Sequence, residues 1–100
     1  KVVYLPIARR QLEEAVTYIA EELCAPDAAD VLLDAVDEAV RALSEMPYRH
    51  ALYPLLFAMK REIRFVLVRN YNLFYVVNED RKTVEIWRFI HQLRAQKRPR

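Results

Sequence analysis

The most constraining feature of the chain is the stretch from Glu62 to Asn78, in which two runs rich in Val, Phe, Tyr and Leu flank the polar pair Arg69-Asn70. β-branched and aromatic side chains fit a pleated, half-buried surface, so each run predicts a β-strand. Asn tolerates a left-handed backbone better than other non-glycine residues, so the pair predicts a tight turn. A third run, Thr83 to Ile90, follows a charged loop. Together the runs predict a three-stranded antiparallel meander whose apolar face needs a cover.

The first half of the chain is expected to supply that cover. Residues 1–5 predict a short strand ended by Pro6, which suits the first position of a helix because its missing N–H would be unpaired there. A second helix restarts after Ala25-Pro26 and ends before Pro47, and two helices with a short joint predict an antiparallel hairpin. Apolar residues recur at helical spacing at Ile7, Leu12, Val16, Ile19 and Leu23, with Ala8 and Ala15 beside them, and then at Ala29, Leu32, Val36, Val40 and Leu43. The residues expected to cover the sheet are Leu12, Val16, Ile19, Leu32, Val36, Val40 and Leu43.

The predicted order of elements is β-α-α-β-β-β, in a single domain that covers residues 1–100. This order predicts an α+β fold, with an antiparallel sheet and the helical hairpin packed on one face. Residues 48–60 have no clean hydrophobic period and predict an ordered loop packed on the sheet. The basic residues after Gln92 predict a mobile end.

The charge of the chain is divided between its halves. Residues 1–50 hold ten acidic residues and five Lys or Arg, a net −5, whereas residues 51–100 hold four acidic residues and eleven Lys or Arg, a net +7. This division predicts an acidic helical surface and a basic surface around the sheet. Two interpretations stay open: attraction between the halves combined with solubility, or a basic face for an anionic partner such as RNA, DNA or an acidic peptide.

Several classes of protein and site find no support in the sequence. No apolar run approaches the roughly 18 residues needed to cross a membrane, and the opening segment lacks the layout of a signal peptide, which favours the cytoplasm. Cys24 is the only cysteine, so no disulfide within the chain is expected. No metal-binding motif joins His50 and His91, and no glycine-rich phosphate loop occurs, so neither a metal nor a cofactor is expected.

The candidate functional residues are basic side chains of the second half. Arg64 and Arg88 lie within runs that are otherwise apolar, which is an unusual place for two guanidinium groups. They could form ion pairs with Glu62 or Glu85, or they could line a concave face opposite the helices and bind a phosphate or carboxylate. His91 follows the third run, where an imidazole could transfer protons near neutral pH or bond to the backbone.

Taken in order, several pieces of the chain resemble the RelE/ParE superfamily of toxins from bacterial type II toxin–antitoxin modules. These pieces are Tyr4 to Ala8 running into a helix, the short-jointed second helix, Leu43 to Tyr48, Arg64 ahead of Asn70 to Tyr75, and Val84 to His91 ending near Arg94. The resemblance covers nearly the whole chain. It implies a small cytoplasmic toxin that inhibits growth, takes part in plasmid stabilisation, and is neutralised by a cognate antitoxin in a hetero-oligomer.

The resemblance also implies two alternative modes of toxicity. RelE-like members cut mRNA in the ribosome, whereas ParE-like members act on DNA gyrase and lack the nuclease residues. A nuclease would use Arg64, Arg88, His91 and Arg94 as its catalytic set, with Lys60 as a further candidate base. However, Asn72 stands where the nucleases often carry Arg, and no tyrosine follows Arg94.

These departures, together with the long helical hairpin, favour a ParE-like toxin that acts by binding. A ribosome-dependent endoribonuclease is the alternative, and a family member that only forms complexes is a third possibility. In each case the basic half of the chain is expected to bind acidic residues of the antitoxin. The expected antitoxin contacts are Arg64, Arg69, Arg88 and Arg94.

Overall fold

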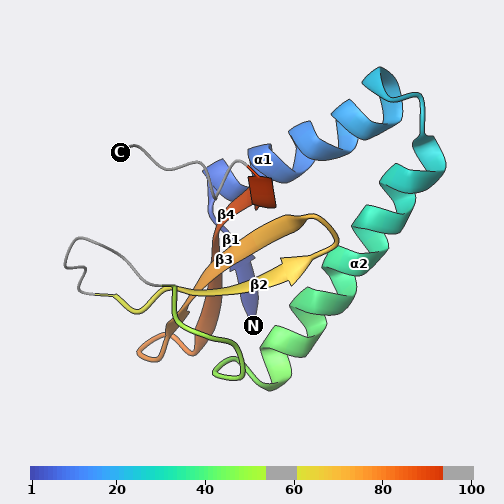
Figure 1. The fold of residues 1–100 in the computed structure, drawn as a ribbon. Coiled ribbons are helices and arrows are strands. Elements are labelled where there is room, and N and C mark those ends of the chain that lie inside the picture. The colour runs from blue at the N-terminus through green and yellow to red at the C-terminus, as the bar shows by residue number, and fades with distance from the viewer. Residues whose placement is uncertain (54–60, 94–100) are drawn as a thin grey trace.

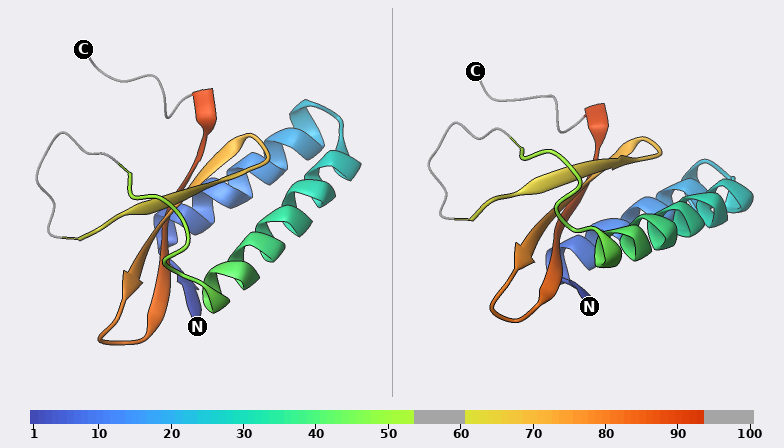
Figure 2. Two further views of the ribbon diagram at one scale, coloured as in Figure 1. Left: turned by 60° about the horizontal axis from the view of Figure 1, so that its bottom comes forward. Right: turned by 90° about the horizontal axis from the view of Figure 1, so that it is seen from below.

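A computed structural model of the chain describes residues 1–53 and 61–93. The elements are β1 (Val2–Tyr4), α1 (Pro6–Thr17), the π-helical turn η1 (Tyr18–Glu22), α2 (Pro26–Glu45), β2 (Arg64–Val68), β3 (Tyr71–Asn78) and β4 (Thr83–His91). This confirms the predicted β-α-α-β-β-β order and the α+β class. The two helices lie on one side of the sheet and meet at a tip that extends beyond it (Figures 1 and 2).

The strands form one sheet in the order β1-β4-β3-β2. β2 pairs antiparallel with β3, and β3 pairs antiparallel with β4, which confirms the predicted meander. β1 departs from the expected antiparallel arrangement because it pairs parallel with β4, with Val2 opposite Val84 and Tyr4 opposite Ile86. Parallel neighbours require a long connection, which the helical hairpin and two strands provide, so the complete sheet is mixed.

The face that α1 turns toward the sheet is built on small residues. Ala8 and Ala15 are buried, and Leu12, Val16 and Ile19 are partly buried against the same core. Ile7 and Leu23 were expected in this stripe, but these residues are 42% and 54% exposed. Ala8 takes the inward position beside Ile7, and the π-helical turn lengthens the helical repeat before Leu23, which displaces Leu23 from the stripe.

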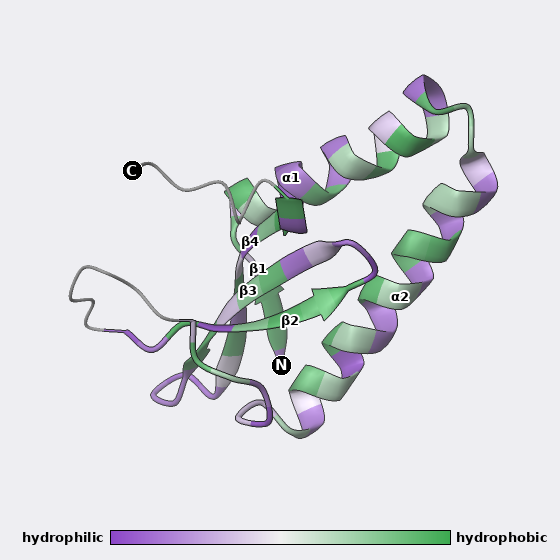
Figure 3. Cartoon of the chain, in the orientation of Figure 1, coloured by the Kyte–Doolittle hydropathy of each residue, from purple (hydrophilic) through white to green (hydrophobic). Residues whose placement is uncertain are grey.

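The inward face of α2 agrees with the prediction. Ala29, Leu32, Val36 and Leu43 are buried, and Val40 is partly buried against the core. Apolar side chains at this spacing form one stripe along a helix, and the charged side chains occupy the other side. Figure 3 shows the two kinds of residue alternating along α2 as the helix turns toward and away from the sheet.

The predicted turn at Arg69-Asn70 joins β2 to β3, but its left-handed residue is Arg69 (φ 55°) and not Asn70. Asn70 instead fixes the turn to the end of β4, since its carbonyl oxygen accepts the Gln92 N–H at 2.8 Å. In the loop predicted over residues 48–60, Leu52 forms an isolated bridge with Arg64, whereas residues 54–60 lie outside the described residues. A basic end was also predicted after Gln92, and its residues from Arg94 onward lie outside the described residues.

Candidate functional site

Arg64 binds the segment that follows α2. Its Nη1 donates hydrogen bonds to the carbonyl oxygens of His50 at 2.7 Å and Tyr48 at 3.4 Å. Its Nη2 lies 3.6 Å from Glu62 Oε1, one of the two ion-pair partners that the sequence proposed. Across the strands Arg64 pairs with Tyr75, which belongs to the core beneath the helices. Arg64 therefore occupies the helix side of the sheet, with much of its donor capacity used inside the chain.

Two tyrosines complete this arrangement at the end of α2. The Tyr75 hydroxyl donates to the carbonyl oxygen of Pro47 at 2.8 Å, and burial raises the pKa of Tyr75. The exposed Tyr48 hydroxyl donates to Glu79 Oε2, and this hydrogen bond raises the pKa of Tyr48. The Arg64 guanidinium carbon lies 5.2 Å from the centre of the Tyr48 ring, a cation–π distance. These contacts connect the end of α2 to β2, β3 and the β3–β4 turn.

Arg88 lies on the opposite face of the sheet from Arg64. It pairs with Phe74, and Phe74 precedes Tyr75 in an extended strand whose successive side chains point to opposite faces. The register shifts between Phe74 and Tyr75, which leaves Trp87 as the extra residue of a bulge in β4. Arg88 Nη1 donates to the Trp87 carbonyl oxygen at 2.7 Å. The Arg88 side chain thus satisfies a backbone acceptor of its own strand.

His91 ends β4 on the helix side. It pairs with Tyr71, and the two rings meet edge to face with centroids 5.2 Å apart. His91 Nδ1 accepts the backbone N–H of Leu93 at 3.2 Å, so the ring bonds to the backbone, as one sequence interpretation proposed. The strand partner of His91 lies four residues from that of Arg64 along β3, a separation of about 13 Å at strand spacing.

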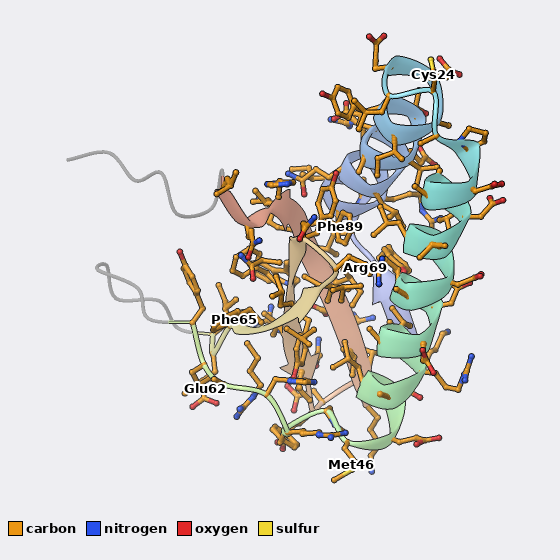
Figure 4. The ribbon with its side chains drawn as sticks, turned by 45° about the vertical axis from the view of Figure 1, so that its right-hand side comes forward. Cys24, Met46, Glu62, Phe65, Arg69 and Phe89 are labelled. Carbon is orange, nitrogen blue, oxygen red and sulfur yellow. The ribbon has the colours of Figure 1, made fainter. Side chains whose placement is uncertain are left out.

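The predicted basic set is therefore dispersed. Arg64 and His91 occupy distant positions on the helix side, and Arg88 occupies the other face, so the hypothesis that Arg64 and Arg88 line one concave face is wrong. Figure 4 illustrates the two faces, with Phe89 beside the helices and Phe65 on the far side of the sheet. Arg69 is exposed at the β2–β3 turn, and Arg94 and Lys60 lie outside the described residues.

One polar cluster on the face of Arg88 was missed by the sequence interpretation. Glu85 accepts hydrogen bonds from Asn78 Nδ2 at 3.0 Å and from Trp87 Nε1 at 3.1 Å, and these bonds lower the pKa of Glu85. Arg61 lies 3.9 Å from the Glu85 carboxylate and 5.8 Å from the centre of the Trp87 ring. The available signal was the spacing of Glu85 and Trp87, because residues two apart share a face of a strand.

In the part of the chain that the structure describes, no group of three or more His, Cys, Asp or Glu side chains is arranged to hold a metal ion. Within the same residues, neither helix combines the length and apolar character needed to cross a membrane.

Comparison with known proteins identifies the family. The family described as the ParE toxin of the type II toxin-antitoxin system, parDE, matches residues 2–96. No curated protein sequence matches significantly. A solved structure described as the chromosomal ParDE TA system from P. aeruginosa is similar in fold, with a TM-score of 0.71, 16% sequence identity, and coverage of 91% of this chain and 94% of that chain. Because the family match spans nearly the whole sequence, the chain belongs to the ParE toxin family of type II toxin–antitoxin modules.

Proposed function

We propose that this ParE-family toxin arrests growth in the cytoplasm by binding DNA gyrase. The observation that carries the proposal is the dispersal of Arg64, Arg88 and His91 over two faces and two ends of the sheet. Cleavage of RNA requires a base, an acid and cations that converge on one phosphate. A toxin that acts by binding requires only a complementary surface, which is compatible with basic residues that are spread apart.

We further propose that a cognate antitoxin neutralises the toxin within a hetero-oligomer. Acidic residues of the antitoxin would meet Arg69, which is exposed, and Arg88, which is half-buried, with Arg94 as an additional contact. Arg64 would contribute indirectly, because two backbone carbonyl oxygens already accept from its guanidinium. The ParDE description of the similar P. aeruginosa structure supports an assembly of this kind.

The gyrase proposal is tested with purified toxin and purified gyrase acting on relaxed plasmid DNA. We expect the toxin to inhibit supercoiling in a concentration-dependent manner, and we expect the antitoxin to restore the activity. A parallel reaction with ribosomes engaged on mRNA is expected to leave the transcript intact. Unaffected gyrase at a large molar excess of toxin, together with cut transcript, would overturn the proposal in favour of the endoribonuclease.

The antitoxin proposal is tested by co-expression with the product of the neighbouring gene. We expect that product to restore growth and to co-purify with the toxin. Charge reversal in Arg88→Glu should weaken the complex, whereas Arg10→Glu, on the exposed surface of α1, should leave its affinity unchanged. Failure of any neighbouring gene product to co-purify would count against the antitoxin proposal.

A further inference from the structure

A cleft of about 430 Å³ lies between α1 and α2, beside the end of β1. Every residue that lines it belongs to residues 1–50, the half of the chain with a net charge of −5. Its chemical character comes from the apolar residues Leu12, Val16 and Leu33 and from the polar residues Tyr4, Glu13 and Asp37. The cleft thus combines aliphatic walls with two carboxylates, and the proposed toxin action and antitoxin contacts use none of these residues.

The aliphatic walls follow from spacing along the two helices. Leu12 and Val16 are four residues apart on α1, so they lie on one side of that helix. Leu33 and Asp37 are related in the same way on α2. Leu12 and Val16 are partly buried against the core, whereas Leu33 is half-buried without belonging to the core cluster. Leu33 therefore gives α2 an apolar surface that faces the cleft and not the sheet.

The two carboxylates of the cleft have no counter-ion of their own. Glu13 and Asp37 are exposed, and in the part of the chain that the structure describes neither forms an ion pair or a hydrogen bond. The cation of the cleft is Arg9, whose guanidinium carbon lies 5.2 Å from the centre of the Tyr4 ring, a cation–π distance. Arg9 thus covers the aromatic ring of the cleft and leaves both carboxylates available to a cation from another molecule.

The Tyr4 hydroxyl adds a hydrogen-bond acceptor to the cleft. Among the described residues this hydroxyl makes no hydrogen bond. Burial, and after it the negative charge of Asp37, raises the pKa of Tyr4, so the Asp37 carboxylate lies near the hydroxyl. A phenol keeps its proton at neutral pH, but its oxygen can still accept a hydrogen bond. An ammonium group beside Asp37 would therefore find a second acceptor in the Tyr4 oxygen.

We propose that this cleft binds the side chain of a lysine carried by a partner protein. The flexible aliphatic stem of lysine covers Leu12, Val16 and Leu33, and its compact ammonium group meets the carboxylates. An arginine gains less here, because Arg9 already occupies the Tyr4 ring on which a planar guanidinium would stack. The negative charge of the half that contains the whole cleft favours the approach of a basic segment. The proposal holds whether or not gyrase is the target, because it concerns only this cleft and the chemistry of its guest.

The probe is the peptide acetyl-Ala-Lys-Ala-amide, titrated into the full chain while NMR signals of the Val16 and Leu33 methyl groups are followed. The matched control peptide carries Nε-acetyl-lysine, which keeps the aliphatic stem and removes the charge. We expect saturable shifts with the lysine peptide, weakened by added salt, and no saturation with the acetylated peptide. Equal responses to the two peptides would overturn the proposal. A stronger response to the arginine peptide would overturn the choice of lysine, and tighter binding of spermidine would overturn the choice of a protein as its carrier.

Variants identify the groups that bind the lysine peptide. Asp37→Asn is expected to weaken binding about two- to fivefold, which is typical of an exposed ion pair. Asp34→Asn removes the same charge from an exposed position of α2 outside the cleft and should leave the affinity unchanged.

The aliphatic wall is tested in the same way. Leu33→Ala is expected to weaken binding about two- to fivefold through loss of apolar contact with the lysine stem. Val31→Ala, at an exposed position of α2 outside the cleft, should not. Because neither Asp37 nor Leu33 belongs to the core cluster, both cleft variants should keep the fold. Wild-type affinity in both of them would contradict the proposed site.

Discussion

Arg64 Nη1 donates a hydrogen bond at 2.7 Å to the carbonyl oxygen of His50, a residue 14 positions earlier in the chain. This contact binds the segment after α2 to the first residue of β2. It also explains why a guanidinium stands in an otherwise apolar run. A charged donor in this position satisfies backbone acceptors where no regular strand neighbour is present.

Arg64→Lys tests this role in stability. A lysine ammonium cannot reproduce the planar fork of donors, so we expect the free energy of unfolding to fall by about 1.5–3 kcal/mol, the usual range for hydrogen bonds to a charged group. Urea denaturation provides the measurement. Arg10→Lys, at an exposed position of α1, should stay within about 0.5 kcal/mol of the wild type. Equal stability of the two variants would show that the Arg64 contacts are dispensable.

Glu85 predicts a dependence of stability on pH. Hydrogen bonds from Asn78 and Trp87 lower its pKa in the folded chain below the ordinary value of 4.5. The carboxylate therefore stabilises the fold above pH 4.5, and this contribution is lost as the pH falls through the lowered folded pKa. Glu85→Gln should be less stable than the wild type at pH 7, and the difference should shrink in acid. Urea denaturation of both proteins at pH 7 and in acid measures this difference in the free energy of unfolding. A difference that grows in acid would contradict the stabilising role given to the Glu85 carboxylate.

Lys82 provides a test of backbone strain. Its φ of 55° lies in the left-handed region, which costs a residue with a Cβ atom about 1–2 kcal/mol. Glycine removes that cost but loses more conformational entropy on folding, so Lys82→Gly should stabilise the chain by several tenths to about 1 kcal/mol. Asp80→Gly, in the same turn without a positive φ, should destabilise it. Thermal melting compares the two, and a lower melting temperature for Lys82→Gly would contradict the argument.

The packing of α2 is tested by neighbouring residues on opposite sides of the helix. Leu32 is 3% exposed and Val31 is 45% exposed. Leu32→Ala leaves a cavity beneath the helix and should destabilise the fold by about 2–4 kcal/mol. Val31→Ala should change it by less than about 0.5 kcal/mol. Calorimetric melting of both variants checks the assigned face, which would be refuted by equal losses of stability.

Much of the fold could be predicted because its signals are local and repeated. The apolar stripe of α2 specifies its inward face residue by residue, and the Arg69-Asn70 pair between two apolar runs specifies a hairpin. The parallel pairing of β1 with β4 could not be predicted, because the relative direction of the two strands depends on how the helical hairpin returns the chain to the sheet. Leu23 was misplaced because a single π-helical turn changes the helical repeat without a composition that distinguishes it.

The candidate site was harder to predict, since its geometry depends on a bulge. Trp87 is the extra residue opposite the Phe74–Tyr75 step, and the hydrophobic run of β4 gives no sign of it. Arg64 and Arg88 could be singled out from the sequence, because each places a guanidinium group in an otherwise apolar run. Their separation onto two faces follows from strand register, which couples residues far apart in sequence and cannot be derived from either strand alone.

The central claim, that growth arrest follows from binding and not from RNA cleavage, is tested most directly by mapping mRNA 5′ ends after induction of the toxin. We predict that growth stops without new ends inside translated messages. We also predict that Arg88→Ala combined with His91→Ala leaves the pattern of ends unchanged. New ends that recur at codon positions and disappear in the double variant, while its fold stays intact, would contradict the account.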